Sequence, residues 1–467
     1  MRKSKGNRET HLKDNKSIQR PILNGLFYSS IAISMSLPYQ YFSARYIHFY
    51  TQELKAAPFL VSIVLIIYGL WNAVNDPLLG WLSDRTRTRL GKRFPYILSG
   101  FIPLSLSFIA VWLPPDSWIG KDTILFIYMI CTFFLFDSFY TLVILNWTAL
   151  FPEKYQKIKQ RNYISAARQV FSVIGIVGAF IIPPIIIGEY GNLSRYRIVG
   201  YILGGITFLN LGLGLFACRD STTRATEAEN YSLKTIKDLF SNRSFLAYLF
   251  SNMCLNLGFV SLMGALPFYN QWILEKKASF ETILNAASIG TALLVLFIWA
   301  YIANKIGAKH VFTLGSLIAT LSFLSLFFFD KNNANIIFIP LVFVGIGIGG
   351  LLMIVDILLA NIIDEDLLNH GFHREGLFFG GNGFAIRIAI AIQGVIFGFV
   401  TNITGFDPDL TTQSSKALLG IKILFIIIPI ISLVLGSLIL FLFYDLDKEK
   451  VALIKSKLQA KKQTIEE

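Results

Sequence analysis

The sequence predicts an all-α polytopic membrane protein with twelve transmembrane helices in two six-helix bundles, and three observations support this. Charged residues make up 15 % of the 467 residues, against roughly 25 % in soluble domains. Hydrophobic residues make up 54 %, and phenylalanine alone occurs 41 times, which is more apolar surface than a globular core of this length needs. About twelve apolar runs can cross a bilayer, and none alternates apolar and polar residues as barrel strands do.

Six of these runs lie in the first half of the chain, separated by short polar loops that contain Pro, Gly and charged residues. They cover residues 24–50, 57–82, 94–114, 123–151, 162–188 and 197–218. We expect residues 1–23 to be a cytoplasmic tail and residues 24–218 to form the N-terminal bundle. The first run is too long for a signal-peptide core, so we expect it to stay in the membrane as an anchor.

A polar segment, residues 219–243, is the longest internal connection and separates the two halves. It is predicted to be a cytoplasmic linker with an amphipathic helix, because apolar residues recur there at helical spacing: Leu233, Ile236, Leu239 and Phe240. We expect residues 244–445 to form the C-terminal bundle and residues 446–467 a basic cytoplasmic tail. The remaining runs cover residues 245–274, 280–304, 310–330, 335–363, 376–402 and 417–444.

A weak internal repeat supports the division into halves. GWLSDRTRTRLGKR (80–93) follows the second run, and the degenerate IANKIGAKH (302–310) follows the eighth. Six runs separate the two segments, as a parallel duplication predicts.

The net charge of +13 comes from basic residues that gather on one side of the predicted membrane. They concentrate before Pro21, in residues 84–93, in residues 219–243 and after Asp445. This asymmetry follows the positive-inside rule, so we expect a multi-pass protein of the cell membrane with both termini in the cytoplasm. Anionic lipid explains the charge, and no nucleic-acid partner is expected.

Enzymatic activity is not expected. Cys131, Cys218 and Cys254 are far apart in the sequence, a pattern that favours neither a metal site nor a disulfide framework. No run carries a nucleophile, a base and an orienting group in recognisable order. We therefore expect no cofactor and no resident metal.

The second run carries a polar stripe formed by Tyr68, Asn72, Asn75 and Asp76. Because residues four apart share a helix face, these side chains are expected to lie together. A carboxylate beside amide oxygens can coordinate Na⁺, or bind a proton if burial raises its proton affinity. The alternative is an ion pair that only fixes helix packing, for example with Arg168 on the fifth run.

Further charged residues lie within runs, where an unpaired charge is unfavourable by a few kcal/mol. Arg168, Arg387, Asp137 and Asp356 are therefore candidates, with Tyr68, for binding a polar or anionic substrate in a common cavity. For Arg45 and His48, near the outer end of the first run, we expect the side chains to snorkel towards water.

Two motifs resemble the glycoside-pentoside-hexuronide:cation symporters, the melibiose-permease branch of the major facilitator superfamily. One is Asn75-Asp76-Pro77-Leu78-Leu79-Gly80 followed by Asp84-Arg85-Thr86-Arg87-Thr88-Arg89-Leu90-Gly91-Lys92-Arg93. The other is the acidic run Asp364-Glu365-Asp366 with Gly371 and then Arg374-Glu375-Gly376. With the helix count, the resemblance covers the whole chain.

The resemblance implies the major facilitator fold, a substrate site between the bundles and coupling to a cation such as H⁺ or Na⁺. It implies that Asp76 is a cation-site carboxylate, Arg168 a substrate-side arginine, and Arg387 the counterpart of a basic residue, usually Lys, in the eleventh helix. Two departures stand out. Asn72 occupies the place of a second cation-site aspartate, and Ser36 and Val143 replace the sugar-binding acids.

Together these features predict a secondary active transporter for a sugar, glycoside or hexuronide, which we expect to be a monomer surrounded by membrane lipid. Pro38-Tyr39-Gln40 and Asp137 also resemble the related lysophosphatidylcholine symporters, so a lysophospholipid carrier is an alternative. A transporter-like sensor that moves no substrate is another. A cytoplasmic gate is expected between loops of opposite charge, formed by Asp84, Arg85, Arg89, Arg93, Asp364, Glu365, Asp366, Arg374 and Glu375.

Overall fold

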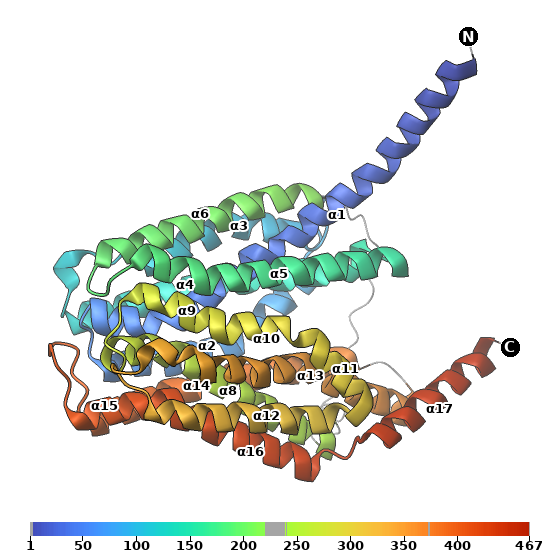
Figure 1. The fold of residues 1–467 in the computed structure, drawn as a ribbon. Coiled ribbons are helices and arrows are strands. Elements are labelled where there is room, and N and C mark those ends of the chain that lie inside the picture. Colours follow the sequence, from blue (N-terminus) through green and yellow to red (C-terminus); the bar gives the residue numbers. More distant parts are fainter. Residues whose placement is uncertain (1–2, 220–238, 240, 372–373, 467) are drawn as a thin grey trace.

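The structure, a computed structural model, describes residues 3–219, 239, 241–371 and 374–466. Within these ranges the chain forms helices and no strand, which confirms the all-α fold class. The amphipathic helix predicted within residues 219–243 lies almost entirely outside the described residues. The two ends of the chain lie at the same end of the bundle, here called the terminal end, and the opposite end is called the distal end (Figure 1).

Each run predicted in the first half is helical. The helices are α1 (Lys3–His48), α2 (Pro58–Arg85), α3 (Phe94–Val111), α4 (Asp122–Lys154), α5 (Ile158–Ile187) and α6 (Leu193–Cys218). Proline at the start of α2 and α3 suits the first helical turn, where no backbone N–H is needed. A π-helical turn, Phe49–Glu53, continues α1 at the distal end.

The second half repeats this pattern with one broken span. Its helices are α8 (Arg243–Trp272), α9 (Glu281–Asn285), α10 (Thr291–Leu294), α11 (Leu296–Ile306), α12 (Ala308–Ser325), α13 (Phe338–His370), α14 (Glu375–Thr404), α15 (Ser415–Lys422), α16 (Ile428–Phe443) and α17 (Lys448–Glu466). The eighth predicted span is bent by 46° between α10 and α11. Segments α15 and α16, joined by a π-helical turn at Ile423–Ile427, form the last span.

Ten helices in the described part of the chain are long and apolar enough to cross a membrane, and eleven when the bent pair counts as one span. The first predicted span lies in α1, which is more polar than the others but packs between α5, α6 and α8. Buried side chains such as Tyr28, Ser34 and Arg45 explain why α1 is less apolar than the lipid-facing helices. A helix enclosed by protein does not need an apolar surface on every side.

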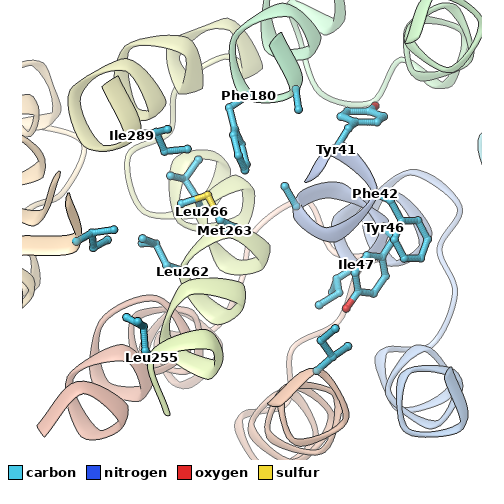
Figure 2. Close-up of a cluster of buried hydrophobic side chains, with 14 of the residues drawn as sticks. Tyr41, Phe42, Tyr46, Ile47, Phe180, Leu255, Leu262, Met263, Leu266 and Ile289 are labelled. Atoms are coloured by element: carbon cyan, nitrogen blue, oxygen red, sulfur yellow. The ribbon is translucent and has the colours of Figure 1, made fainter. Parts of the chain in front are cut away.

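The two halves meet along α1 and α8 in a cluster of buried apolar side chains. Figure 2 shows Phe42, Tyr46 and Ile47 on α1 near Leu262 and Met263 on α8. In a bilayer the lipid tails are as apolar as these side chains, so close packing rather than the hydrophobic effect holds the helices together.

Glycines allow α2 and α14 to approach closely across the two halves. A Cβ atom added to Gly69 would lie 2.7 Å from the Cβ of Ala391, and one added to Gly394 would lie 2.6 Å from the Cβ of Leu65. Real Cβ atoms essentially never come this close. The interface therefore depends on small residues, as is common between membrane helices.

We expect Gly69→Ala to destabilise the protein, because the new methyl group meets the backbone of Ala391 as well as its side chain. Overpacking of this kind typically lowers stability by about 1–3 kcal/mol. Gly80→Ala on the same helix is the matched control, since nothing lies within 4 Å of its added Cβ. Thermal unfolding of both purified variants checks this, and an equal or higher melting temperature for Gly69→Ala would contradict it.

Helix α17 forms the last element and packs against α13 at the terminal end. Its Ile454 is buried, and Lys450 forms an ion pair of 2.8 Å with Glu365 on α13. The predicted basic tail is therefore helical, and Lys450 and Ile454 in its first half make these contacts.

Candidate functional site

The polar stripe of α2 faces Asp137 on α4. Asp137 Oδ1 accepts hydrogen bonds from Tyr68 Oη at 3.1 Å and from Asn72 Nδ2 at 2.8 Å. Asp137 Oδ2 accepts one from Asn75 Nδ2 at 3.0 Å. With a relative exposure of 1 %, Asp137 is a buried carboxylate whose two oxygens are held by three donors from one helix. These three hydrogen bonds fix the position of the carboxylate.

Asp76 lies beside this cluster and connects three helices. Its Oδ1 accepts a hydrogen bond from Thr141 Oγ1 on α4 at 3.0 Å, and its Oδ2 pairs with Arg387 Nη2 on α14 at 2.7 Å. Arg387 Nη1 also lies 3.4 Å from Tyr39 Oη on α1. An ion pair thus joins the two halves directly next to the buried carboxylate of Asp137.

The interpretation of Arg168 as a possible partner of Asp76 is wrong, because Asp76 pairs with Arg387. The Arg168 guanidinium instead lies over two aromatic rings of α4, 4.0 Å from the ring centre of Trp147 and 4.6 Å from that of Phe151. Similar depth in the membrane suggested the pairing, but depth does not determine which way a helix faces. Stacking on aromatic rings satisfies a guanidinium without a carboxylate.

A cavity of about 360 Å³ lies between the halves and is lined mainly by helices of the C-terminal half. Asp356 on α13 and Tyr39 on α1 line it, whereas Arg168, Arg387 and Asp137 do not. Of the residues expected to bind substrate in a common cavity, only Asp356 lines this one. Asp76, Asp137 and Arg387 lie together outside the lining of this cavity, whereas Asp356 belongs to the lining.

Amide side chains form one side of this cavity. Asn382 Oδ1 accepts hydrogen bonds from Asn252 Nδ2 at 2.6 Å and from Tyr248 Oη at 3.1 Å. Asn256 Nδ2 donates to Asn252 Oδ1 at 3.0 Å. This network ties α8 to α14. Sequence reasoning missed it, although Asn252 and Asn256 are four residues apart and share a helix face.

A buried ion pair closes the distal end between the halves. Arg45 on α1 pairs with Glu281 on α9, with Nη1 2.9 Å from Oε1, and the two side chains are only 4 % and 1 % exposed. Tyr190 Oη also donates to Glu281 and accepts a hydrogen bond from Asn270 Nδ2 at 2.8 Å. Glu281 lies at the start of the eighth predicted run, where an acid is typical of the membrane interface, so no sequence pattern indicated its role.

The expectation that Arg45 and His48 snorkel towards water is wrong. His48 is fully buried, and its Nε2 lies 2.8 Å from Gln271 Oε1 of the other half. The opposite half covers this end of α1, so the polar side chains find partners across the interface instead of water. Further hydrogen bonds join the halves at the distal end: Trp272 Nε1 to Gln52 Oε1, Ser279 N to Gly188 O and Asn285 Nδ2 to Phe180 O.

The predicted cytoplasmic gate lies at the terminal end. On the N-terminal side, Arg93 donates from Nη1 to Ser83 Oγ at 2.8 Å, and the Arg85 guanidinium lies 4.1 Å from the ring centre of Trp81. These contacts stay within one half. The side chain of Asp84 lies outside the described part of the chain.

On the C-terminal side, Asp366 and Arg374 form a buried ion pair, with Arg374 Nε 2.8 Å from Asp366 Oδ2. His370 Nδ1 lies 3.0 Å from Asp366 Oδ1, and Glu365 pairs with Lys450 of α17. The acidic loop is thus held in place from its own half. Its pairing with the basic loop of the other half stays a prediction.

Comparison with known proteins identifies the family. A family described as MFS/sugar transport protein matches residues 27–448. The chain belongs to this family. The resemblance to the glycoside-pentoside-hexuronide symporters is thereby confirmed, the protein is a membrane transporter homologue, and its relatives are transporters rather than enzymes.

Three relatives match over most of their length. An uncharacterized symporter of Synechocystis is 27 % identical, with 90 % of this chain and 93 % of that protein covered. The isoprimeverose transporter of Lactiplantibacillus pentosus is 22 % identical, covering 90 % and 88 %. The sodium-dependent lysophosphatidylcholine symporter 1 of Gallus gallus is also 22 % identical, covering 84 % and 80 %.

A solved structure supports the fold. A bacterial homologue of the human lysosomal transporter Spinster, described as inward-facing and unoccupied, aligns with a TM-score of 0.69 at 11 % identity. The alignment covers 91 % of this chain and 97 % of that one. This similarity confirms the major facilitator fold.

Proposed function

We propose that the protein is a secondary active transporter that couples movement of a small organic solute to H⁺ or Na⁺ by alternating access. One observation carries this proposal. Asp76 belongs to the carboxylate cluster of α2 and α4, and its ion pair with Arg387 also joins α2 to α14 of the other half. A change of charge at Asp76 therefore acts directly on the contact between the halves.

The coupling follows from competition for one carboxylate. In this structure the Arg387 guanidinium supplies the positive charge that Asp76 needs at membrane depth. A proton or Na⁺ bound at Asp76 replaces that charge and weakens the pair. The halves are then held less tightly along α2 and α14, and they can rock around the central site.

The cluster offers the oxygen ligands that a hard cation prefers. Two carboxylates, Asp76 and Asp137, lie on facing helices, and Asn72 Oδ1 is buried without a hydrogen-bond partner in the described part of the chain. The family resemblance places a second aspartate where Asn72 stands. Here Asn72 contacts Asp137, so the second acid of the proposed cation site comes from α4 instead of α2.

The closed distal end agrees with an alternating-access cycle. The positive-inside rule makes both termini cytoplasmic, so the distal end faces outwards. A state sealed by Arg45 and Glu281 on the outside is the one from which the cavity opens to the cytoplasm. The basic and acidic loops at the terminal end would then form the second gate.

For the solute, the family favours a sugar, glycoside or hexuronide, as the isoprimeverose transporter illustrates. The mostly apolar cavity favours the second candidate, a lysophospholipid-type amphiphile, as carried by the Gallus gallus relative. The sensor hypothesis requires that neither class be transported.

Thermal stabilisation of the purified protein distinguishes these candidates. The panel contains isoprimeverose, methyl glucuronide and lysophosphatidylcholine, each with Na⁺ or choline and at two pH values. We expect at least one solute to raise the melting temperature, and Na⁺ or protons to increase this shift, because solute and cation stabilise the same state. Stabilisation that is identical with Na⁺ and choline and at both pH values would contradict coupling.

A further inference from the structure

Among the described residues that line the central cavity, Asp356 is the only one with a charged side chain. It lies near the middle of α13, its side chain is exposed to the cavity, and it forms no hydrogen bond or ion pair with any described residue. The other carboxylates between the helices have partners: Asp76 has Arg387, and Glu281 has Arg45. An ionised carboxylate at membrane depth is unfavourable by several kcal/mol unless a positive group or water accompanies it.

The two arginines expected to bind substrate do not line this cavity and have contacts of their own. Arg387 is held by Asp76 and Tyr39, and Arg168 is stacked on Trp147. No Lys, Arg or His belongs to the described lining of the cavity. An anionic solute would therefore face the carboxylate of Asp356 without a compensating charge, which disfavours a hexuronide.

The remaining wall is mainly aliphatic and aromatic. Phe180, Phe259 and Phe323 line the cavity together with leucines and isoleucines. The side-chain oxygen of Asn382 already accepts hydrogen bonds from Asn252 and Tyr248. It is therefore less available to accept a hydrogen bond from a solute. Such a wall suits an apolar body, and aromatic faces also attract organic cations.

We propose that the cavity selects a solute with an amine or quaternary ammonium group on an apolar body, and that Asp356 binds the positive group. This inference rests on the proposed function in one respect, namely that the cavity is where the solute binds. Charge complementarity explains both the single carboxylate and the apolar wall. It also makes Asp356 a specificity-determining residue instead of a second coupling site.

Binding of three probes to the purified protein tests this inference. The probes share a phenylbutyl body and end in trimethylammonium, hydroxyl or carboxylate, and isothermal titration measures their affinities. We expect the cation to bind about tenfold more tightly than the alcohol, and the carboxylate to bind most weakly, because only the cation pairs with Asp356. Equal affinities for the three probes would overturn the inference.

Substitutions at Asp356 test whether this side chain causes the preference for the cationic probe. Asp356→Asn keeps the size of the side chain and removes its charge, so the preference for the cation should fall to about twofold or less. Asp356→Glu should retain the preference, which shows that the altered cavity still folds. Asp330→Asn, in an exposed loop away from the cavity, is the matched control. A full preference in Asp356→Asn would overturn the assignment.

The binding assay separates this inference from the proposed function, since it needs no transport. If the Asp356-dependent preference is found but ion-coupled transport is not, the inference holds and the proposed function fails. If the protein transports neutral or anionic solutes equally well with and without Asp356, the inference fails and the proposed transport function still holds.

Discussion

Asp76→Asn is expected to abolish uphill accumulation of the solute and to leave passive exchange in place. The substitution preserves the size of the side chain but removes the charge for which Arg387 and the coupling cation compete. Without that charge, a cation gradient no longer drives the change between states. Accumulation should then stop at equal internal and external concentrations, measured as solute uptake into liposomes with an imposed Na⁺ or proton gradient.

A double variant shows whether the loss arises from coupling. Asp76→Asn alone leaves the guanidinium of Arg387 partly buried without its counter-charge, which is itself unfavourable. Asp76→Asn combined with Arg387→Gln removes both charges, so exchange should be faster than in the single variant while accumulation stays absent. Asp330→Asn controls for the substitution in an exposed loop. Accumulation at the wild-type level in Asp76→Asn would remove Asp76 from the coupling mechanism.

Glu281→Gln is expected to open the distal end. The change leaves Arg45 buried between the halves without its carboxylate, and removing one partner of a buried ion pair typically costs about 3–5 kcal/mol. The upper part of this range approaches the 5.5 kcal/mol or so that moves a two-state equilibrium from 1:99 to 99:1. Because the pair exists only when the distal end is closed, its removal destabilises the closed state and not the open one.

Chemical labelling measures this shift. A cysteine introduced at Ser288, which lines the cavity, should react faster with a membrane-impermeant reagent added on the distal side in Glu281→Gln than in the parent. Restoring opposite charges with Arg45→Glu and Glu281→Arg together should slow the labelling again, at least in part. Unchanged labelling in Glu281→Gln would mean that the ion pair does not hold the distal end closed.

The sequence predicted the positions of the spans well, because a bilayer requires long apolar runs and leaves few other ways to use them. It did not predict the bend between α10 and α11, because the residue at the bend is Val295 and not a proline or glycine. It also did not indicate that α1 is enclosed by protein. Enclosure depends on which helices surround α1, and a one-dimensional hydropathy pattern carries no such information.

The candidate site was predictable only where its residues share one helix. Tyr68, Asn72 and Asn75 lie on one face because of helical spacing, and the structure brings all three to Asp137. Partners on other helices depend on helix rotation and on contact between the halves. For this reason Arg387 could not be assigned to Asp76 from sequence, and the suggested pairing of Asp76 with Arg168 was wrong.

The central claim is that solute and cation move together, and ion flux measured with the purified protein in liposomes tests it most directly. Each solute of the stabilisation panel, and the trimethylammonium probe, is added without any ion gradient while dyes report internal Na⁺ and pH. The account predicts that a transported solute carries Na⁺ or protons inwards, and that Asp76→Asn abolishes this ion movement. Solute entry with no movement of either ion would contradict it.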